Sequence, residues 1–182
     1  MAWIVPPAFA PQEAAIELSL EVLGSGKSSR LYERLVRTGL AMSVSTWLDD
    51  AELASVAGIE VMLPEGGSPA VAESVVREEL KRLAEEPPRS DELRRALKGL
   101  LVGLASSLQL LDTRGGDGGR AGLLQKLNHY LGDPGALPQV IQRLANTTAE
   151  ESRRATAEFL APEHSLTIVT EPGAAPVEAG ED

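Results

Sequence analysis

The tripeptide Gly26-Lys27-Ser28 contains the residue types that most directly suggest a chemical task in this chain, the binding of a phosphate group. In a phosphate-binding loop, glycine N–H groups wrap the phosphate and the lysine supplies positive charge. That loop requires glycine at the position of Glu21, and a carboxylate there would repel phosphate. It also follows a strand, whereas residues 12–23 carry apolar side chains at helical spacing. We therefore expect no nucleotide site.

Other residues that could do chemistry are few and scattered. The two histidines, His129 and His164, lie far apart and have no paired carboxylates at ligand spacing, so we expect His129 to cap a helix or face solvent and predict no zinc site. The chain has no cysteine, which excludes a thiolate metal site and a cysteine nucleophile. Ser43 and Ser45 have no histidine near them in sequence to act as a base.

An acidic group, Asp49, Asp50 and Glu52, could bind a cation or act as an acid–base pair. It lies between two alternating runs, where aspartate commonly forms turns, and the pattern favours a solvated loop.

The composition restricts the partners. The net charge of −10 and a pI of about 4.8 disfavour binding to nucleic acid or to an anionic membrane. Aromatic residues make up only 3% of the chain, too few for base-stacking platforms. No stretch approaches the roughly 18 apolar residues of a membrane span. With 182 residues, one globular domain is expected.

The first part of the chain is predicted to form a strand, two helices and a hairpin. Residues 2–5 are β-prone and end at two prolines, and helical spacing runs from about Pro11 to Gly24. Ser28 or Ser29 starts a short helix, which Gly39 closes. Two alternating runs, residues 40–46 and 57–63, predict an antiparallel pair joined by the acidic turn.

The second part is predicted to be mostly helical. Helices start at Ser68-Pro69 and at Ser90, and the leucines of the latter form a seam that we expect to pack against the sheet. Four glycines in residues 115–119 form a hinge or a loop, after which helical spacing resumes at Leu123. A capping box at Thr148 begins the last helix.

The chain ends with a predicted strand at residues 165–170, followed by a disordered acidic tail at residues 172–182. Strands and helices are segregated along the chain, which favours a two-layer α+β domain over residues 1–171, with an antiparallel-rich mixed sheet and helices packed on one face. Because the chain opens directly on a strand, we expect a longer polypeptide to precede it.

Four segments, in this order and spacing, resemble the pitrilysin/insulinase family of zinc peptidases, which includes the mitochondrial processing peptidases. The run from Leu23 to Arg37, Leu-Gly-Ser-Gly-Lys-Ser-Ser-Arg-Leu-Tyr and onward, is similar to the opening of the second, non-zinc half of the peptidase unit. The other three are the strand at residues 2–7, the glycine break at 115–121 with residues 128–134, and the closing segment at 159–169. The resemblance implies the same α+β fold.

This resemblance identifies two candidate site residues. Active members supply an arginine and, several residues later, a tyrosine that together bind the substrate carbonyl and the tetrahedral intermediate. Arg37 matches that arginine with a one-residue gap, and Met42 occupies the tyrosine position. A thioether has no O–H donor, so Met42 cannot stabilise an oxyanion. Either this half has lost the transition-state contact, or Arg37 acts alone. Arg37 is also explained as a helix-terminal arginine stabilised by the helix dipole. With Lys27, Arg30 and Arg34 it forms a basic stripe or a solvated face.

The resemblance implies a non-catalytic half that forms the chamber wall and a peptide-contact surface opposite a zinc-bearing half. The family signature H-x-x-E-H is absent here, so the chain holds no cofactor, the zinc is implied in the partner half, and the chain alone is expected to be inactive. The implied partners are that half and an unfolded peptide, with a homodimer as a further option. The alternative is an inactive structural or assembly domain of the same fold. Solubility, in a bacterial periplasm or cytoplasm, is expected.

Overall fold

The computed structural model describes residues 1–111, 118–171 and 173. Its sheet has three strands, β1 (Ala2–Val5), β2 (Ser43–Asp49) and β3 (Ser55–Met62), in the order β1-β3-β2. Both pairings are antiparallel, and Trp47 lies opposite Gly58 in the hairpin. The predicted hairpin with a long turn is therefore confirmed.

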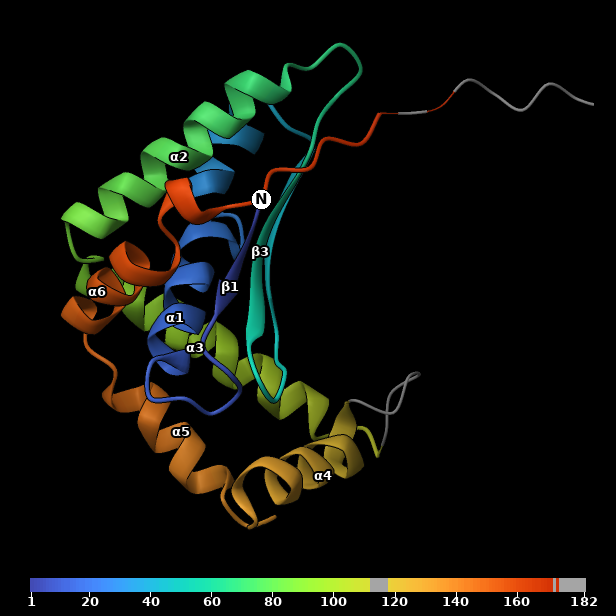
Figure 1. Ribbon diagram of the computed structural model, residues 1–182, viewed down its shortest axis with the longest axis vertical. Helices are drawn as coiled ribbons and strands as arrows, with labels where there is room; N and C mark the ends of the chain where they lie inside the picture. Colours follow the sequence, from blue (N-terminus) through green and yellow to red (C-terminus); the bar gives the residue numbers. More distant parts are fainter. Residues whose placement is uncertain (112–117, 172, 174–182) are drawn as a thin grey trace, which may run out of the picture.

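Helices pack on one face of this sheet (Figure 1). The longer ones are α1 (Glu13–Gly24), α2 (Pro69–Glu85), α3 (Ser90–Ser107), α4 (Gly119–Leu131), α5 (Leu137–Asn146) and α6 (Ala149–Phe159). A π-helix, η1 (Tyr32–Val36), precedes β2, and a single 3₁₀ turn, η2 (Pro162–His164), follows α6. This arrangement confirms the predicted two-layer α+β class. Within the described ranges, no helix combines the length and apolarity needed to cross a bilayer.

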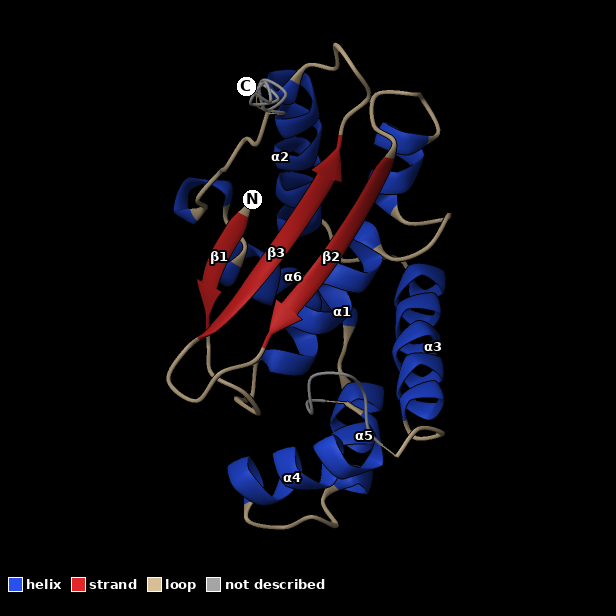
Figure 2. Ribbon diagram, turned by 90° about the vertical axis from the view of Figure 1, so that its right-hand side faces the viewer, coloured by secondary structure: helices blue, strands red, loops and turns tan. Residues whose placement is uncertain are grey.

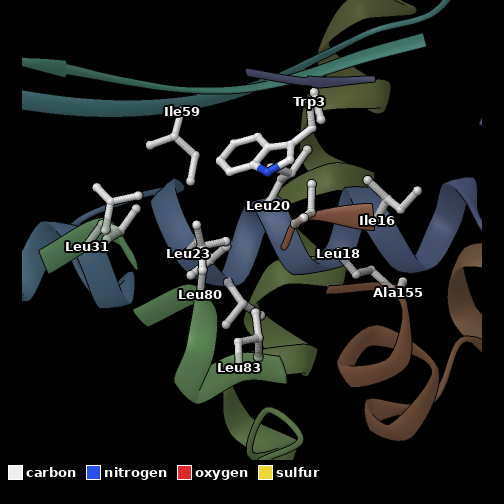
Figure 3. Packing of buried hydrophobic residues seen from close by; sticks show 14 of the residues in the cluster. Trp3, Ile16, Leu18, Leu20, Leu23, Leu31, Ile59, Leu80, Leu83 and Ala155 are labelled. Atoms are coloured by element: carbon white, nitrogen blue, oxygen red, sulfur yellow. The ribbon is translucent and has the colours of Figure 1, made fainter. Parts of the chain in front are cut away.

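Helix α1 is the centre of the core. It is apolar on nearly every side because it lies between the sheet and the outer helices α2, α3 and α6 (Figures 1 and 3). Leu18 and Leu23 have no exposed surface, and Leu80 and Leu83 of α2 meet them from the other side. Trp3 covers α1 from the sheet and donates a hydrogen bond from Nε1 to the carbonyl of Ala161, 2.9 Å away. The indole therefore links β1 to the end of α6.

Two predicted helix starts have the expected cap chemistry. The Ser68 hydroxyl accepts a hydrogen bond from Val71 N–H at 3.4 Å, with proline at the first helical position. Thr148 and Glu151 form the reciprocal capping box. The start of α3 differs, because Arg89 is its cap residue and the Glu92 carboxylate accepts the Arg89 N–H at 2.8 Å.

Three expectations about the second part are corrected. The leucine seam of α3 packs chiefly on α1, not on the sheet, because α1 already covers that face (Figure 2). Helix α5 was not predicted, although Val140, Ile141 and Leu144 have helical spacing. The strand at 165–170 is reduced to one bridge between Ala2 and Leu166. The predicted tail lies outside the described residues, as does most of the glycine segment 115–119.

Candidate functional site

The glycines of the turn after α1, Gly24 and Gly26, allow close packing and a reversal of the chain. A Cβ on Gly24 would lie 2.3 Å from Cγ2 of Thr46, so only glycine lets α1 approach β2 this closely. Gly26 has a φ of +76°, which favours glycine, and Ser29 caps the next helix by accepting the N–H of Tyr32 at 3.4 Å. Helix α1 stands where a phosphate-binding loop requires a strand, as the sequence predicted.

Arg37 follows the π-helix, and its N–H bonds the carbonyl of Tyr32, five residues back, at 3.0 Å. Its side chain is 71% exposed, and its Nη1 lies 2.7 Å from Oε2 of Glu33. An exposed pair of this kind contributes at most about 0.5 kcal/mol to stability. The guanidinium therefore remains largely accessible from solvent.

The remaining arginines of the predicted stripe serve the fold. Arg30 binds Glu92 of α3 through Nε and Nη2, both at 3.0 Å, and both side chains are largely buried. Arg34 bridges Glu78 and the buried Glu79 of α2. The segment is therefore attached to two helices by ion pairs and is not a uniform basic surface.

Met42 lies just before β2, where its N–H donates to the carbonyl of Met62 at 2.7 Å. The side chain is 62% exposed. Its exposure makes this position available to a bound peptide, but a thioether there supplies only apolar contact.

The outer face of the sheet is the largest feature that the sequence reasoning did not identify. Ile4, Trp47 and Met62 point to this side, opposite the helices, and are 73%, 41% and 53% exposed. The Trp47 ring lies directly over Gly58, where a Cβ would come within 2.2 Å of the indole. None of the described helices covers this face (Figure 1). The sequence contains a signal for this face, because Ile4 and Trp47 alternate with the inward-facing residues of their strands and so must point to the opposite side.

The predicted solvated loop is confirmed for Asp49 and Glu52, which are exposed, but not for Asp50. Asp50 is only 18% exposed at its side chain and forms an ion pair with Lys126 of α4. Burial raises the pKa of Glu17 on α1 to about 7, and the neighbouring carboxylates of Glu13 and Asp50 add to that rise. The Asp50–Lys126 pair attaches α4 to the domain, whereas burial and the neighbouring negative charges favour the protonated form of Glu17.

The two histidines lie on separate elements. His129, in the last turn of α4, stacks edge-on against Tyr130 and is about half exposed, as the sequence predicted. His164 ends η2. Within residues 1–111, 118–171 and 173, no three His, Asp or Glu side chains are grouped so that they could hold a metal ion.

Two hollows open on the helical side. The larger, of about 650 Å³, lies between α2 and the end of α6, where Arg77 pairs with Glu73 and donates to the carbonyl of Pro162. The smaller, of about 370 Å³, lies between the glycine turn and α3. Within the described residues, neither lining includes a histidine; the larger contains Ser74, which donates a long hydrogen bond of 3.5 Å to Glu78.

Comparison with known proteins places this geometry among peptidase-related domains. A family model described as the peptidase M16 inactive domain matches residues 1–100. A comparison with curated proteins finds no match.

Similar solved structures share the fold over most of the chain. The inactive peptidase domain of a candidate zinc protease from Bordetella parapertussis has a TM-score of 0.73 at 22% identity, covering 97% of this chain and 92% of that one. A protease from Helicobacter pylori has a TM-score of 0.74 at 18% identity, covering 90% and 38%. A chain of complex III from Candida albicans has a TM-score of 0.73 at 11% identity, covering 87% and 38%.

Proposed function

The chain belongs to the family of peptidase M16 inactive domains, and on this premise we propose that it is the non-catalytic half of a pitrilysin/insulinase-like zinc peptidase. In this function, residues 1–171 form one wall of a chamber that a zinc-bearing half closes. The zinc ion activates water for attack on a peptide bond, and its ligands lie in the other half. This chain contributes the surface against which an unfolded peptide lies.

The uncovered outer face of the sheet is the observation that carries the proposal. The helices supply a second layer on one side of the sheet only, and the outer face combines exposed apolar side chains with exposed serines and acids. Ile4, Trp47 and Met62, one on each strand, offer apolar contacts on the open side to an extended peptide. Apolar contacts of this kind do not require the bound peptide to have one particular sequence.

Arg37 is the candidate contact to the substrate carbonyl. Its exposure and its position at the end of η1 support this role, since a guanidinium donates several hydrogen bonds in one plane. Met42 cannot assist as an O–H donor, and this favours the second candidate function, an assembly domain without catalysis.

The test is reconstitution with a zinc-bearing half that contains H-x-x-E-H. We expect neither half alone to cleave an unfolded protein, the mixture to cleave it, and a chelator to abolish cleavage. Ile4→Gln on the outer face should weaken activity, whereas Val102→Gln, at another exposed apolar residue on α3, should not. Chelator-sensitive cleavage by this chain alone would refute the proposal, and a stable complex without cleavage would establish the assembly function. Light scattering of the chain alone decides whether it also forms a homodimer.

A further inference from the structure

The side chains on the outer face of the sheet stand in an order that places an aromatic ring beside an acid. Gly58 of β3 lies between Ala2 of β1 and Trp47 of β2, and Glu60, two residues further along β3, lies opposite Ser45. Residues directly opposite each other in neighbouring strands point to the same face. Figure 2 looks onto this face, where Glu60 is exposed. Trp47 and Glu60 are therefore diagonal neighbours on the open side of the sheet.

The indole of Trp47 presents one of its two sides to solvent. A Cβ on Gly58 would lie 2.2 Å from Cε2 and Cζ2 of the ring and 2.7 Å from Nε1, so the ring covers the glycine. Because Trp47 is 41% exposed, the side of the ring that is turned away from β3 is open. The face of a tryptophan ring attracts cations more strongly than that of tyrosine or phenylalanine. The outer face therefore offers an aromatic surface to a positive charge.

The charge on this face has one sign. Within the three strands, the charged residues that point outward are Asp49 and Glu60, and both are exposed acids. Neither takes part in an ion pair with another described residue. The net charge of the chain is −10, so its long-range field has the same sign. A basic peptide is attracted to the outer face, and an acidic one is repelled.

One basic side chain can contact the ring and the acid together. Glu60 and Gly58 share a strand and a face, so their Cα atoms are about 7 Å apart. A cation binds an indole when it lies within about 6 Å of the ring centre. A guanidinium or ammonium group over the ring is therefore within reach of the Glu60 carboxylate, while its aliphatic stem lies on the apolar surface of the indole.

We propose that Trp47 and Glu60 form a subsite for one basic side chain of an unfolded peptide that lies on the outer face. The proposal rests on the proposed function, the peptide-contact wall, and adds which peptides that wall selects. Arginine is favoured over lysine, because a planar guanidinium stacks on the ring and donates to a carboxylate in the same plane. Apolar residues of the same peptide contact Ile4 and Met62 on either side.

The test follows the two indole N–H signals by NMR while a peptide is added. The probe is acetyl-Val-Ser-Arg-Ser-Val-amide, in which the valines share the face of the arginine when the peptide is extended. The second peptide has citrulline, which has nearly the same shape without the charge, in place of arginine. We expect the arginine peptide to move the Trp47 signal and not that of the buried Trp3, and the citrulline peptide to bind about fivefold more weakly or worse.

Substitution of the acid gives a matched comparison. Glu60→Gln should weaken binding of the arginine peptide about threefold and leave that of the citrulline peptide unchanged. Glu158→Gln removes the same charge from an exposed position on α6, on the helical side of the sheet, and should change neither affinity.

Three outcomes would overturn the proposal. Equal affinity of the wild-type chain for the two peptides would leave the outer face as a peptide contact but remove its selectivity. Equal weakening by Glu60→Gln and Glu158→Gln would show that only net charge matters. If neither peptide moves the Trp47 signal, the subsite and the peptide contact on this face both fail. The first and third comparisons use the unaltered chain, so they do not depend on how a variant folds, and none of the three requires peptide cleavage.

Discussion

The ion pair between Arg30 and Glu92 attaches the segment after the glycine turn to α3, and its removal provides the sharpest test of how this fold is held together. Glu92 is 6% exposed and accepts Arg30 Nε and Nη2, both at 3.0 Å, and the N–H of Arg89 at 2.8 Å. Arg30→Met keeps most of the apolar stem and removes the charge. The change therefore leaves a carboxylate with little access to water.

Breaking a buried pair from one side costs about 3–5 kcal/mol. The lower value applies here, because the exposed Arg89 guanidinium lies 3.6 Å from Glu92 and still offsets part of the charge. We expect a loss of about 3 kcal/mol, which for a chain of this size lowers the Tm by roughly 6–12 °C. Urea unfolding at pH 7 measures it.

The double variant with Glu92→Gln separates charge burial from lost packing. Glutamine remains an acceptor for the Arg89 N–H but carries no charge, so the double variant should regain about 2 kcal/mol of the loss. Arg37→Met, at an exposed pair, should cost no more than about 0.5 kcal/mol. A loss below about 1 kcal/mol for Arg30→Met, or a double variant no more stable than the single one, would refute the reasoning.

The pH dependence gives the pair a second signature. Burial raises the pKa of Glu92, but the hydrogen bonds from Arg30 and the Arg89 N–H outweigh it and lower the pKa below the usual range. The contribution of the pair is therefore complete above the unfolded pKa, near 4.3, and is lost as the pH falls through the lower folded value. Arg30→Met should remove this loss of stability in acid.

Three further changes test other parts of the molecule. Glu17 has a folded pKa of about 7, so its ionisation lowers stability as the pH rises from about 4.5 to 7. Glu17→Gln should therefore stabilise the protein by about 2 kcal/mol at pH 8 and by little at pH 5. Equal effects of the substitution at both pH values would count against a buried acid. Gly58→Ala should displace Trp47, cost about 1–3 kcal/mol and shift the tryptophan emission, whereas the control Gly103→Ala, whose Cβ meets nothing, should be neutral or stabilising. Arg37→Ala should leave the Tm nearly unchanged but lower the kcat/KM of the reconstituted peptidase, and unaltered cleavage would show that Arg37 is not a substrate contact.

The elements of the first hundred residues could be predicted because their signals are local. Alternation in the two runs before and after Asp50 sets the hairpin, and Gly24, Ser29 and Ser68 mark helix ends through backbone geometry and capping. The same locality explains why α5 was missed. Its short apolar stripe follows Pro134 and Gly135, which indicate a turn. Only its contacts with α1 and α3 reveal that Leu144 is buried and the rest of the stripe partly covered.

The candidate site was predicted only in part. The order of motifs identified the family, and with it Arg37 and Met42 as positions to examine. The sequence did not distinguish exposed from buried charges: Arg30 and Arg34 are spaced like Arg37, yet they pair with acids on α2 and α3 that lie at least 44 residues away. Ion pairs between residues so far apart in the sequence depend on how the helices pack against one another.

The sequence by itself determined the strands, most helices and the absence of a zinc signature, since each follows from residue type and near-neighbour spacing. Only the tertiary structure decided which face of the sheet stays uncovered and which charges are buried. These properties arise when segments distant in the chain compete for the same surface: α1 takes the inner face of the sheet, and none of the described helices covers the outer face.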